Sequence, residues 1–355
     1  MFNKYSRPYV IYKKVLNGLL NILTRLILPL RNLNKPISVA YPNILIISHK
    51  DKQCGVYQYG VNISEALRKS KKYRFVYCEC ENKLALDLAI EIHDPVAIIY
   101  NYYPDTMSWL NSWVTHSYDT IPQLGILHEN TQKKADMTTN QLFDYTLCPD
   151  PTLIDRNPVV FKTLRLIHDY TNTKPLPDTV TIGSFGFGSN DKGFERLVDM
   201  VQQEFDVAII NFLMPFNDII DKEGTRFTLA TAEQCRKAVY KPGITLNISH
   251  KFLTKPELLD FLASNTANAF FYDVKKEHGI SSTIEYALAV HRPLVINKCG
   301  MFRHVFNAEP SICIENSTIK EIIANGTAPL QPFYGAWTEE KFIQRYEQII
   351  DEVLK

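Results

Sequence analysis

The sequence predicts an α/β protein built from two doubly wound domains that face each other across a central cleft. Two observations predict this fold. Strand-like and helix-like patterns alternate along the chain in two separate series, and a polar, Pro-rich stretch, NTKPLPDT at 172–179, divides the series. Strands that alternate with helices form parallel sheets covered on both faces. At 355 residues the chain is long enough for two such domains.

The first series begins with NILIISH at 43–49, which is apolar enough for a fully buried strand. A glycine-containing loop and a helix that ends near Ser70 follow it. Three more strands are expected in RFVYCEC, AIIYNYY and QLGILHE, with helices in LALDLAIEIH and around Trp109. These elements predict a Rossmann-like first domain over residues 40–178.

A second series begins after the Pro-rich stretch. Six segments have the apolar character of strands: VTIGSFGF, VAIINFLM, ITLNISH, NAFFYDV, PLVINK and SICIEN. They predict a second Rossmann-like domain over residues 179–330, with a helical segment, 331–355, behind it. Ligands of open parallel sheets bind at the carboxyl ends of the strands, so we expect the binding site in the cleft between the domains.

The composition excludes several classes of protein. Hydrophobic residues make up 45% of the chain and charged residues 22%, as in a soluble globular protein. The seven cysteines are scattered and form no CxxC pair, which argues against a disulfide framework or a zinc site. This usage favours reduced thiols in the cytoplasm. We expect no nucleic-acid partner.

The N-terminal segment, residues 1–39, is basic and rich in Leu and Ile. Asn17, Asn21 and Arg25 interrupt its apolar run, so it is a poor transmembrane span, and it lacks the small-residue cleavage site of a signal peptide. Two interpretations stay open: a helix packed on the domain or a solvated leader, and an amphipathic helix that holds the protein peripherally on an anionic membrane surface. The basic residues of 1–36 are Lys4, Arg7, Lys13, Lys14, Arg25, Arg31 and Lys35.

Each predicted domain opens with a strand and a glycine-containing loop. In the second domain Gly186, Gly188 and Gly193 follow the strand, but the third glycine comes two residues too late for the dinucleotide fingerprint, and the GxxxxGK[ST] phosphate loop is absent. Lys192 stands in this loop just before a helix. Its ammonium and the loop amides could hold a phosphate, although a single loop lysine is more often solvated.

The stretch KKEHGISSTIEYALAVHRPLVI contains two acids, Glu277 and Glu285, on either side of a Gly-Ser turn. The turn follows a strand and precedes a helix, so its amides and the helix dipole favour a diphosphate. One acid could accept hydrogen bonds from a ribose and the other from a transferred sugar. Alternatively, Glu277 is a solvated loop acid and Glu285 is only stabilised by the dipole. The turn residues that would bind the diphosphate are Gly279, Ile280 and Ser281.

This stretch resembles the E-x7-E signature of retaining glycosyltransferases with the GT-B fold, especially family 4, also called glycosyl transferases group 1. TIGSFGFGSNDKGFERLV resembles the diphosphate loop of that family, in which Lys192 and Gly193 match. QCGVYQYGVNISEAL resembles its N-terminal glycine loop, in which Gly55 matches. FYGAWTEEKFIQRYEQII resembles the helix that crosses back to the first domain. The resemblance covers about residues 42–355.

The resemblance implies an enzyme that moves a sugar from a nucleotide-sugar donor to a glycan or lipid-linked acceptor with retention, in the synthesis of a surface polysaccharide or glycoconjugate. Glu277 and His128 would stabilise the oxocarbenium-like sugar, and Glu285 would hold the ribose. Phe252 and Leu253, at the start of KFLTKPELL, would line the base. The residues implied for the donor diphosphate are Lys192, Gly188, Gly279, Ile280, Ser281 and Gly55.

The chain departs from this family at Gly186, where many members have an arginine, so another cation such as Arg303 would have to compensate. No Asp-x-Asp motif is present. We expect neither a metal nor another cofactor, because Lys192 and the helix end would stabilise the leaving diphosphate. Two other functions stay open: a sugar-nucleotide epimerase of the same fold, and a non-catalytic glycan-binding protein.

Overall fold

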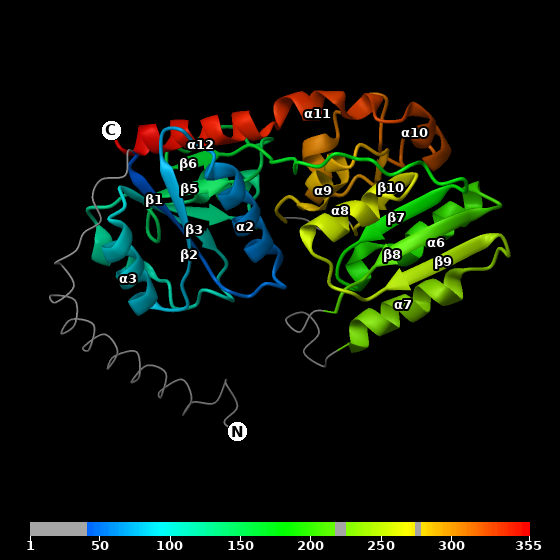
Figure 1. The fold of residues 1–355 in the computed structure, drawn as a ribbon, viewed down its shortest axis with the longest axis horizontal. Helices are drawn as coiled ribbons and strands as arrows, with labels where there is room; N and C mark the ends of the chain where they lie inside the picture. The colour runs from blue at the N-terminus through cyan, green and yellow to red at the C-terminus, as the bar shows by residue number, and fades with distance from the viewer. Residues whose placement is uncertain (1–40, 217–224, 274–277) are drawn as a thin grey trace, which may run out of the picture.

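The computed structural model describes residues 41–216, 225–273 and 278–355, which form two α/β domains side by side (Figure 1). Each domain contains one sheet, and all strand pairs are parallel, so the predicted fold class is confirmed. The first sheet has the order β2 (Arg74–Glu79), β1 (Asn43–Ser48), β3 (Ala97–Tyr102), β4 (Gln123–Leu127), β5 (Tyr145–Cys148) and β6 (Val160–Lys162). The second has the order β11 (Leu294–Ile296), β10 (Ala267–Phe270), β7 (Thr181–Phe185), β8 (Ala208–Leu213) and β9 (Ile244–Ser249).

Helices cover both faces of the first sheet, which is why β1 is a continuous apolar run. Ile44 packs on one face together with α2 (Gly55–Leu67) and α12 (Glu339–Val353). Leu45, the next residue, packs on the opposite face together with α3 (Lys83–His93). Successive strand residues point to opposite faces of a sheet, so both faces require apolar side chains.

The other helices are shorter or belong to the second domain. The first domain adds α4 (Ser112–Thr115), η2 (His116–Tyr118) and α5 (Gln132–Met137). The second domain contains η3 (Asn190–Lys192), α6 (Phe194–Glu204), α7 (Arg226–Ala238), α8 (Lys255–Ala263), α9 (Thr283–Ala289), η4 (Gly300–Val305), α10 (Ile319–Asn325), η5 (Ala328–Leu330) and α11 (Gln331–Ala336).

The C-terminal helix connects the two hydrophobic cores. Trp337, just after α11, packs in the core of the second domain, whereas Phe342 and Tyr346 of α12 are buried in the core of the first. The chain therefore crosses back and ends on the first domain (Figure 1).

The structure differs from the sequence prediction at four elements, of which two were expected wrongly and two were missed. The helix expected around Trp109 is wrong, since α4 starts only at Ser112 and is one turn long. SICIEN is not a strand, and only Cys313 forms a bridge, to Ile296. The strands β5 and β6 were not predicted, because four and three residues are too few for a pattern.

All seven cysteines are free. Within the described ranges, no helix is long and apolar enough to span a membrane. The predictions for residues 1–39 lie outside the described residues.

Candidate functional site

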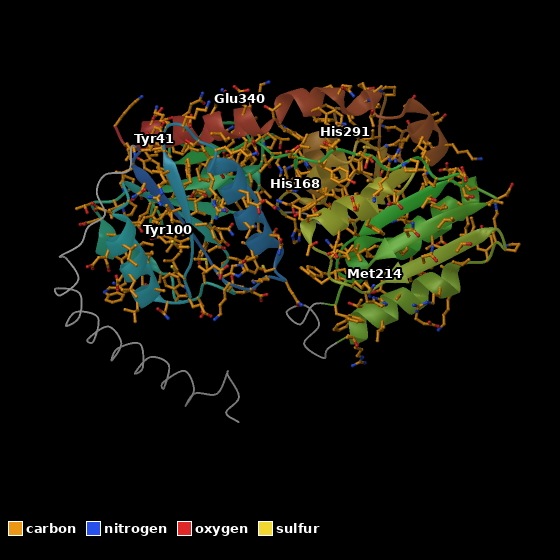
Figure 2. The ribbon with its side chains drawn as sticks, in the orientation of Figure 1. Tyr41, Tyr100, His168, Met214, His291 and Glu340 are labelled. Carbon is orange, nitrogen blue, oxygen red and sulfur yellow. The ribbon has the colours of Figure 1, made fainter. Side chains whose placement is uncertain are left out.

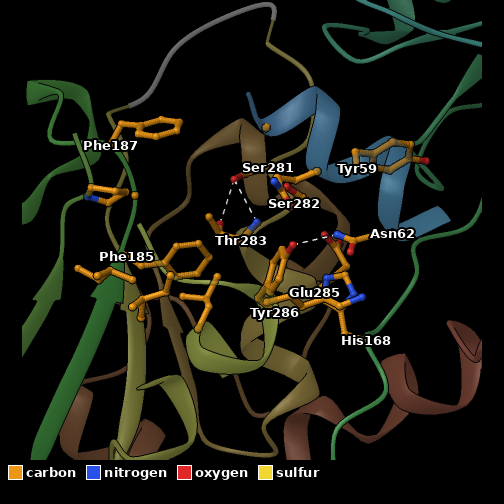
Figure 3. Close-up of a pocket in the computed structure, with 18 of the residues that line it drawn as sticks. Tyr59, Asn62, His168, Phe185, Phe187, Ser281, Ser282, Thr283, Glu285 and Tyr286 are labelled. Carbon is orange, nitrogen blue, oxygen red and sulfur yellow. Dashed lines mark hydrogen bonds between the residues drawn. The ribbon is translucent and has the colours of Figure 1, made fainter. Parts of the chain in front are cut away.

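A cavity of about 270 Å³ lies between the two domains. The first domain contributes the start of α2 and the segment after β6, and the second contributes the loops that follow β7, β8, β9 and β10. Figure 3 shows Tyr59 and Asn62 of α2 on one side, Phe185 and Phe187 on the other, and Ser281 with its neighbours between them. The carboxyl ends of both sheets thus meet at one cavity, the usual ligand position in such folds.

One wall of the cavity is apolar. Phe185, Phe187, Phe252 and Leu253 line it, so both residues that the sequence suggested for a base lie on the cavity. Phe252 is 44% exposed and therefore lies where the cavity opens to solvent. Such a wall suits a planar aromatic group that inserts from outside.

Lys192 supplies a cation to the cavity. Its Nζ lies 3.8 Å from the centroid of the Tyr272 ring, and both residues line the cavity. Among the residues that the structure describes, no carboxylate forms an ion pair with Lys192. An ammonium group that rests on a ring rather than on an acid is available to an anionic ligand.

Glu285 lines the cavity and forms a buried ion pair that the sequence did not suggest. Arg165 donates from Nε to Oε1 at 2.7 Å and from Nη2 to Oε2 at 2.6 Å, and both side chains are 3% exposed. Burial alone would raise the pKa of Glu285, but the guanidinium outweighs it and lowers the pKa to about 2. The carboxylate is therefore ionised at every physiological pH. Arg165 follows β6 within TLRLIHDY, which contains no motif.

The neighbour of Glu285 on α9 also contacts the first domain. Asn62 donates a hydrogen bond to the Tyr286 hydroxyl at 2.8 Å, inside the protein (Figure 3). The centroids of the His168 and Tyr286 rings lie 4.1 Å apart, and His168 lies between the two domains (Figure 2). Burial, followed by the nearby Lys255 charge, lowers the pKa of His168 to about 3, so this imidazole is neutral. Two consecutive residues of α9 thus hold the domains together at the cavity.

His128 lies beside the cavity rather than on its lining. Its Nε2 lies 2.8 Å from Asn101 Oδ1, and Asn101 Nδ2 donates to the Val56 carbonyl at 2.6 Å. Because a carbonyl only accepts, the Asn101 amide has one orientation, and His128 must donate from Nε2 and keep a lone pair on Nδ1. Burial, followed by the Arg165 and His49 charges, lowers the pKa of His128 to about 3.

The turn before α9 lies against the first domain. The Gly279 amide donates to Glu129 Oε2 at 3.0 Å, and a Cβ at Gly279 would stand 1.7 Å from the His128 carbonyl oxygen. Ser281 lines the cavity, but its amide donates to the Met301 carbonyl at 3.0 Å. Two of the three turn residues predicted for a diphosphate, Gly279 and Ser281, therefore already have acceptors for their amides in this conformation.

The remaining predicted site residues are dispersed. Gly55 lines the cavity, and no atom lies within 4 Å of the place where its Cβ would be. Gly188 is buried against α7, where a Cβ would stand 2.8 Å from Thr228 Cα, and neither it nor Ile280 lines the cavity. Glu277 lies outside the described residues.

Arg303, the suggested replacement for the missing arginine, has another partner. It forms an ion pair of 2.5 Å with Asp150 across the domain boundary and does not line the cavity. In the part of the chain that the structure describes, no group of three His, Cys, Asp or Glu side chains could hold a metal ion.

Comparison with protein-family models gives no match, and comparison with curated proteins gives none either. Solved structures do match. HepE of Anabaena, crystallised with UDP and glucose, has a TM-score of 0.62 and 11% identity over 88% of this chain and 100% of that one. A glycosyltransferase from Rickettsia africae scores 0.64 at 9% identity over 89% and 100% of the two chains. Sucrose-phosphate synthase from Thermosynechococcus elongatus scores 0.62 at 12% over 88% and 99%. The chain thus has the GT-B fold.

Proposed function

We propose that this chain transfers a sugar from a nucleotide-sugar donor to a glycan or lipid-linked acceptor, with retention and without a metal. One observation carries the proposal. A single cavity at the carboxyl ends of both sheets combines an apolar wall at Phe252, a cation at Lys192 and a buried carboxylate at Glu285. A base, a diphosphate and a ribose require these three features. Two structural neighbours, the glycosyltransferase from Rickettsia africae and HepE, which was crystallised with UDP and glucose, support the same chemistry.

The donor would bind with its base against Phe252 and Leu253, and with its diphosphate toward Lys192. A ribose hydroxyl would donate to Glu285. Arg165 takes one of the two acceptor positions on each carboxylate oxygen, and His304 Nε2 lies 3.4 Å from Oε1, so the position on Oε2 is the one open to a hydroxyl. Arg165 then keeps the carboxylate ionised and fixed in orientation, as an acceptor of a hydroxyl requires.

The reaction breaks the bond between the sugar C1 and the diphosphate oxygen, and negative charge develops on the diphosphate. Lys192 would stabilise that charge. The acceptor hydroxyl would attack C1 from the face that the diphosphate leaves, and its proton would pass to the leaving phosphate oxygen. The neutral His128 would accept a hydrogen bond from a sugar hydroxyl at Nδ1, and Glu277 is proposed to stabilise the positive charge on the sugar.

The test uses the full chain with UDP-, GDP- and ADP-sugars and a panel of glycan acceptors. Acceptor-dependent release of the nucleoside diphosphate, unchanged by EDTA, is expected. Lys192→Met should lower kcat/KM about 100-fold, the usual effect of removing one group that stabilises developing charge. Lys237→Met, which changes an exposed lysine on α7, is the matched control.

Three outcomes would contradict the proposal. Conversion of the donor sugar without an acceptor would indicate an epimerase. Glycan binding without turnover of any donor would indicate a binding protein. Loss of transfer with EDTA, restored by Mg²⁺ or Mn²⁺, would remove the metal-free part alone.

We further propose that residues 1–36 bring the enzyme to an anionic membrane that carries a lipid-linked acceptor. The segment has seven Lys or Arg and no Asp or Glu. Each basic residue near such a surface contributes about 1 kcal/mol, which decreases as salt increases. The full chain should float with anionic liposomes, whereas a chain that starts at Ile37 should stay folded and unbound. Equal behaviour of the two would remove the membrane proposal.

A further inference from the structure

We propose that the Tyr272 hydroxyl is a second ligand of the donor diphosphate, beside Lys192; the inference rests on the proposed function. Tyr272 lies two residues beyond the end of β10 and lines the cavity, and it is 2% exposed. Its hydroxyl is buried and has no hydrogen-bond partner within the described ranges. Buried polar groups nearly always have partners, so an orphan at a ligand cavity indicates a partner that the ligand brings.

Gly186 leaves the side of the hydroxyl that faces the cavity lining free of a side chain. A Cβ at Gly186 would lie 3.8 Å from the Tyr272 hydroxyl oxygen and 3.9 Å from Lys192 Cδ, and all three residues line the cavity. The φ angle of Gly186 is +153°, a value that residues other than glycine rarely adopt. The backbone thus keeps a residue without a side chain next to the hydroxyl, where a ligand atom has room.

The charge around the hydroxyl selects an anion. The Lys192 ammonium rests 3.8 Å from the centroid of the Tyr272 ring, so a group that reaches the hydroxyl also reaches the cation. Phosphate oxygens only accept hydrogen bonds, whereas a phenol can donate one, and such charge-assisted bonds are the strong ones. On binding, the ammonium would leave the ring for the phosphate, and the same movement would uncover the hydroxyl.

The hydroxyl and the ring of Tyr272 have separable roles. The ring packs against Phe302 at 4.8 Å between centroids and meets Phe270 edge-on at 6.4 Å. A phenylalanine would make the same ring contacts. Removal of an unpaired buried hydroxyl is neutral or stabilising for the fold, so a change in ligand affinity in Tyr272→Phe would report the ligand contact.

The experiment measures binding of UDP, inorganic pyrophosphate and uridine to the full chain by calorimetry, together with transfer. In Tyr272→Phe, the affinities for UDP and pyrophosphate should fall about 10- to 100-fold, as when a hydrogen bond to a charged group is lost. Uridine affinity should stay within about twofold, and the melting temperature should not fall. Tyr334→Phe is the matched control, because its hydroxyl is also buried and unpartnered in the second domain but lies off the cavity.

Each contrary result has a separate meaning. If Tyr272→Phe binds UDP and pyrophosphate like the wild type while the wild type transfers sugar, the proposal is wrong and the function stands. If uridine affinity falls as much as UDP affinity, the hydroxyl does not contact the diphosphate, and the proposal is again wrong. If the wild type binds none of the probes and transfers no sugar from any donor, the function and the inference fail together.

Discussion

Arg165 and Glu285 put a full positive and a full negative charge inside the protein, one from each domain. Charges are moved out of water at high cost, and only a well-formed pair recovers that cost. Here Arg165 uses two donors on Glu285 and a third on the Pro149 carbonyl, at 2.6 Å. The pair therefore fixes the relative position of the domains at the cavity more than it adds stability.

Removal of one partner should be much worse than removal of both. Arg165→Met leaves Glu285 buried without its cation, with only His304 Nε2 at 3.4 Å from Oε1, which should cost about 3–5 kcal/mol in urea denaturation. The double variant Arg165→Met with Glu285→Leu should recover most of this loss. Arg156→Met breaks an exposed pair with Asp136, and should cost less than about 1 kcal/mol. If Arg165→Met and Arg156→Met lower the free energy of unfolding equally, the pair of Arg165 and Glu285 is not effectively buried.

The same pair determines a pH dependence. The pKa of Glu285 is depressed to about 2 from the usual 4.5, so the stabilisation is present above 4.5 and is lost as the pH falls toward about 2. In Arg165→Met the strongest influence that lowers the pKa of Glu285 is removed, and only the weaker His304 contact is left against burial, so the pKa rises. The variant should therefore approach the wild type as the pH falls and the carboxyl becomes protonated. Urea denaturation at about pH 7 and about pH 4.5 measures the difference in free energy of unfolding between the wild type and the variant. A difference that grows on acidification would contradict this account.

His128 should be neutral with its proton on Nε2. Its depressed pKa of about 3 and the fixed Asn101 amide predict no titration near the usual histidine value. In ¹⁵N spectra of histidine-labelled protein, Nε2 of His128 should carry the proton and Nδ1 should stay unprotonated down to about pH 4. Asn101→Ala removes the acceptor and should mix the tautomers. A resonance of His128 that titrates near 6.5 would disprove the assignment.

At the scale of elements, the turn that leads into α9 depends on the absence of a side chain. Gly279 is so close to the His128 carbonyl that a Cβ would stand 1.7 Å from the oxygen. The contact brings the segments after β4 and β10 together, from different domains. The sequence pattern suggested this glycine for its amide, whereas the structure gives it a steric role as well.

Gly279→Ala should force the domains apart at the cavity. We expect kcat/KM to fall about 100-fold, because a displacement of about 1 Å disrupts alignment of the reacting groups. Small-angle scattering should show a larger radius of gyration. Gly335→Ala is the matched control: no atom lies within 4 Å of its Cβ position, so activity should be unchanged. Full activity of Gly279→Ala would mean that this contact is absent during turnover.

The sequence predicted the elements that repeat and missed the contacts that cross between domains. Long apolar runs such as β1 and the regular alternation carry the fold class, because burial on both faces leaves a local pattern. Lys192 and Phe252 could be predicted because each stands in a loop after the carboxyl end of a strand, where ligands bind in such folds. Arg165 could not be predicted, because its partner Glu285 is 120 residues away and nothing local marks a buried arginine. The orphan Tyr272 hydroxyl likewise exists only as a feature of packing.

At the scale of the whole molecule, the two domains share contacts on both sides of the cavity. Asn62 pairs with Tyr286, Arg165 with Glu285, and Asp150 with Arg303. On the outer side, α12 leaves the second domain and completes the first core. The first domain, which the chain begins to form at β1, thus includes a helix that arrives some 290 residues later.

Phe342→Ala should therefore destabilise a domain from which the residue is distant in sequence. Phe342 is fully buried in the core of the first domain, and such truncations cost about 3–5 kcal/mol. Since the loss belongs to one core, hydrogen exchange should become faster in β1 and α2 and stay unchanged in β7 and β8. Leu354 is 40% exposed just after the same helix, and Leu354→Ala, the control, should change hydrogen exchange in neither domain. Faster exchange of equal size in both domains would mean that the two cores unfold as one unit, and α12 would then stabilise the whole molecule rather than the first domain alone.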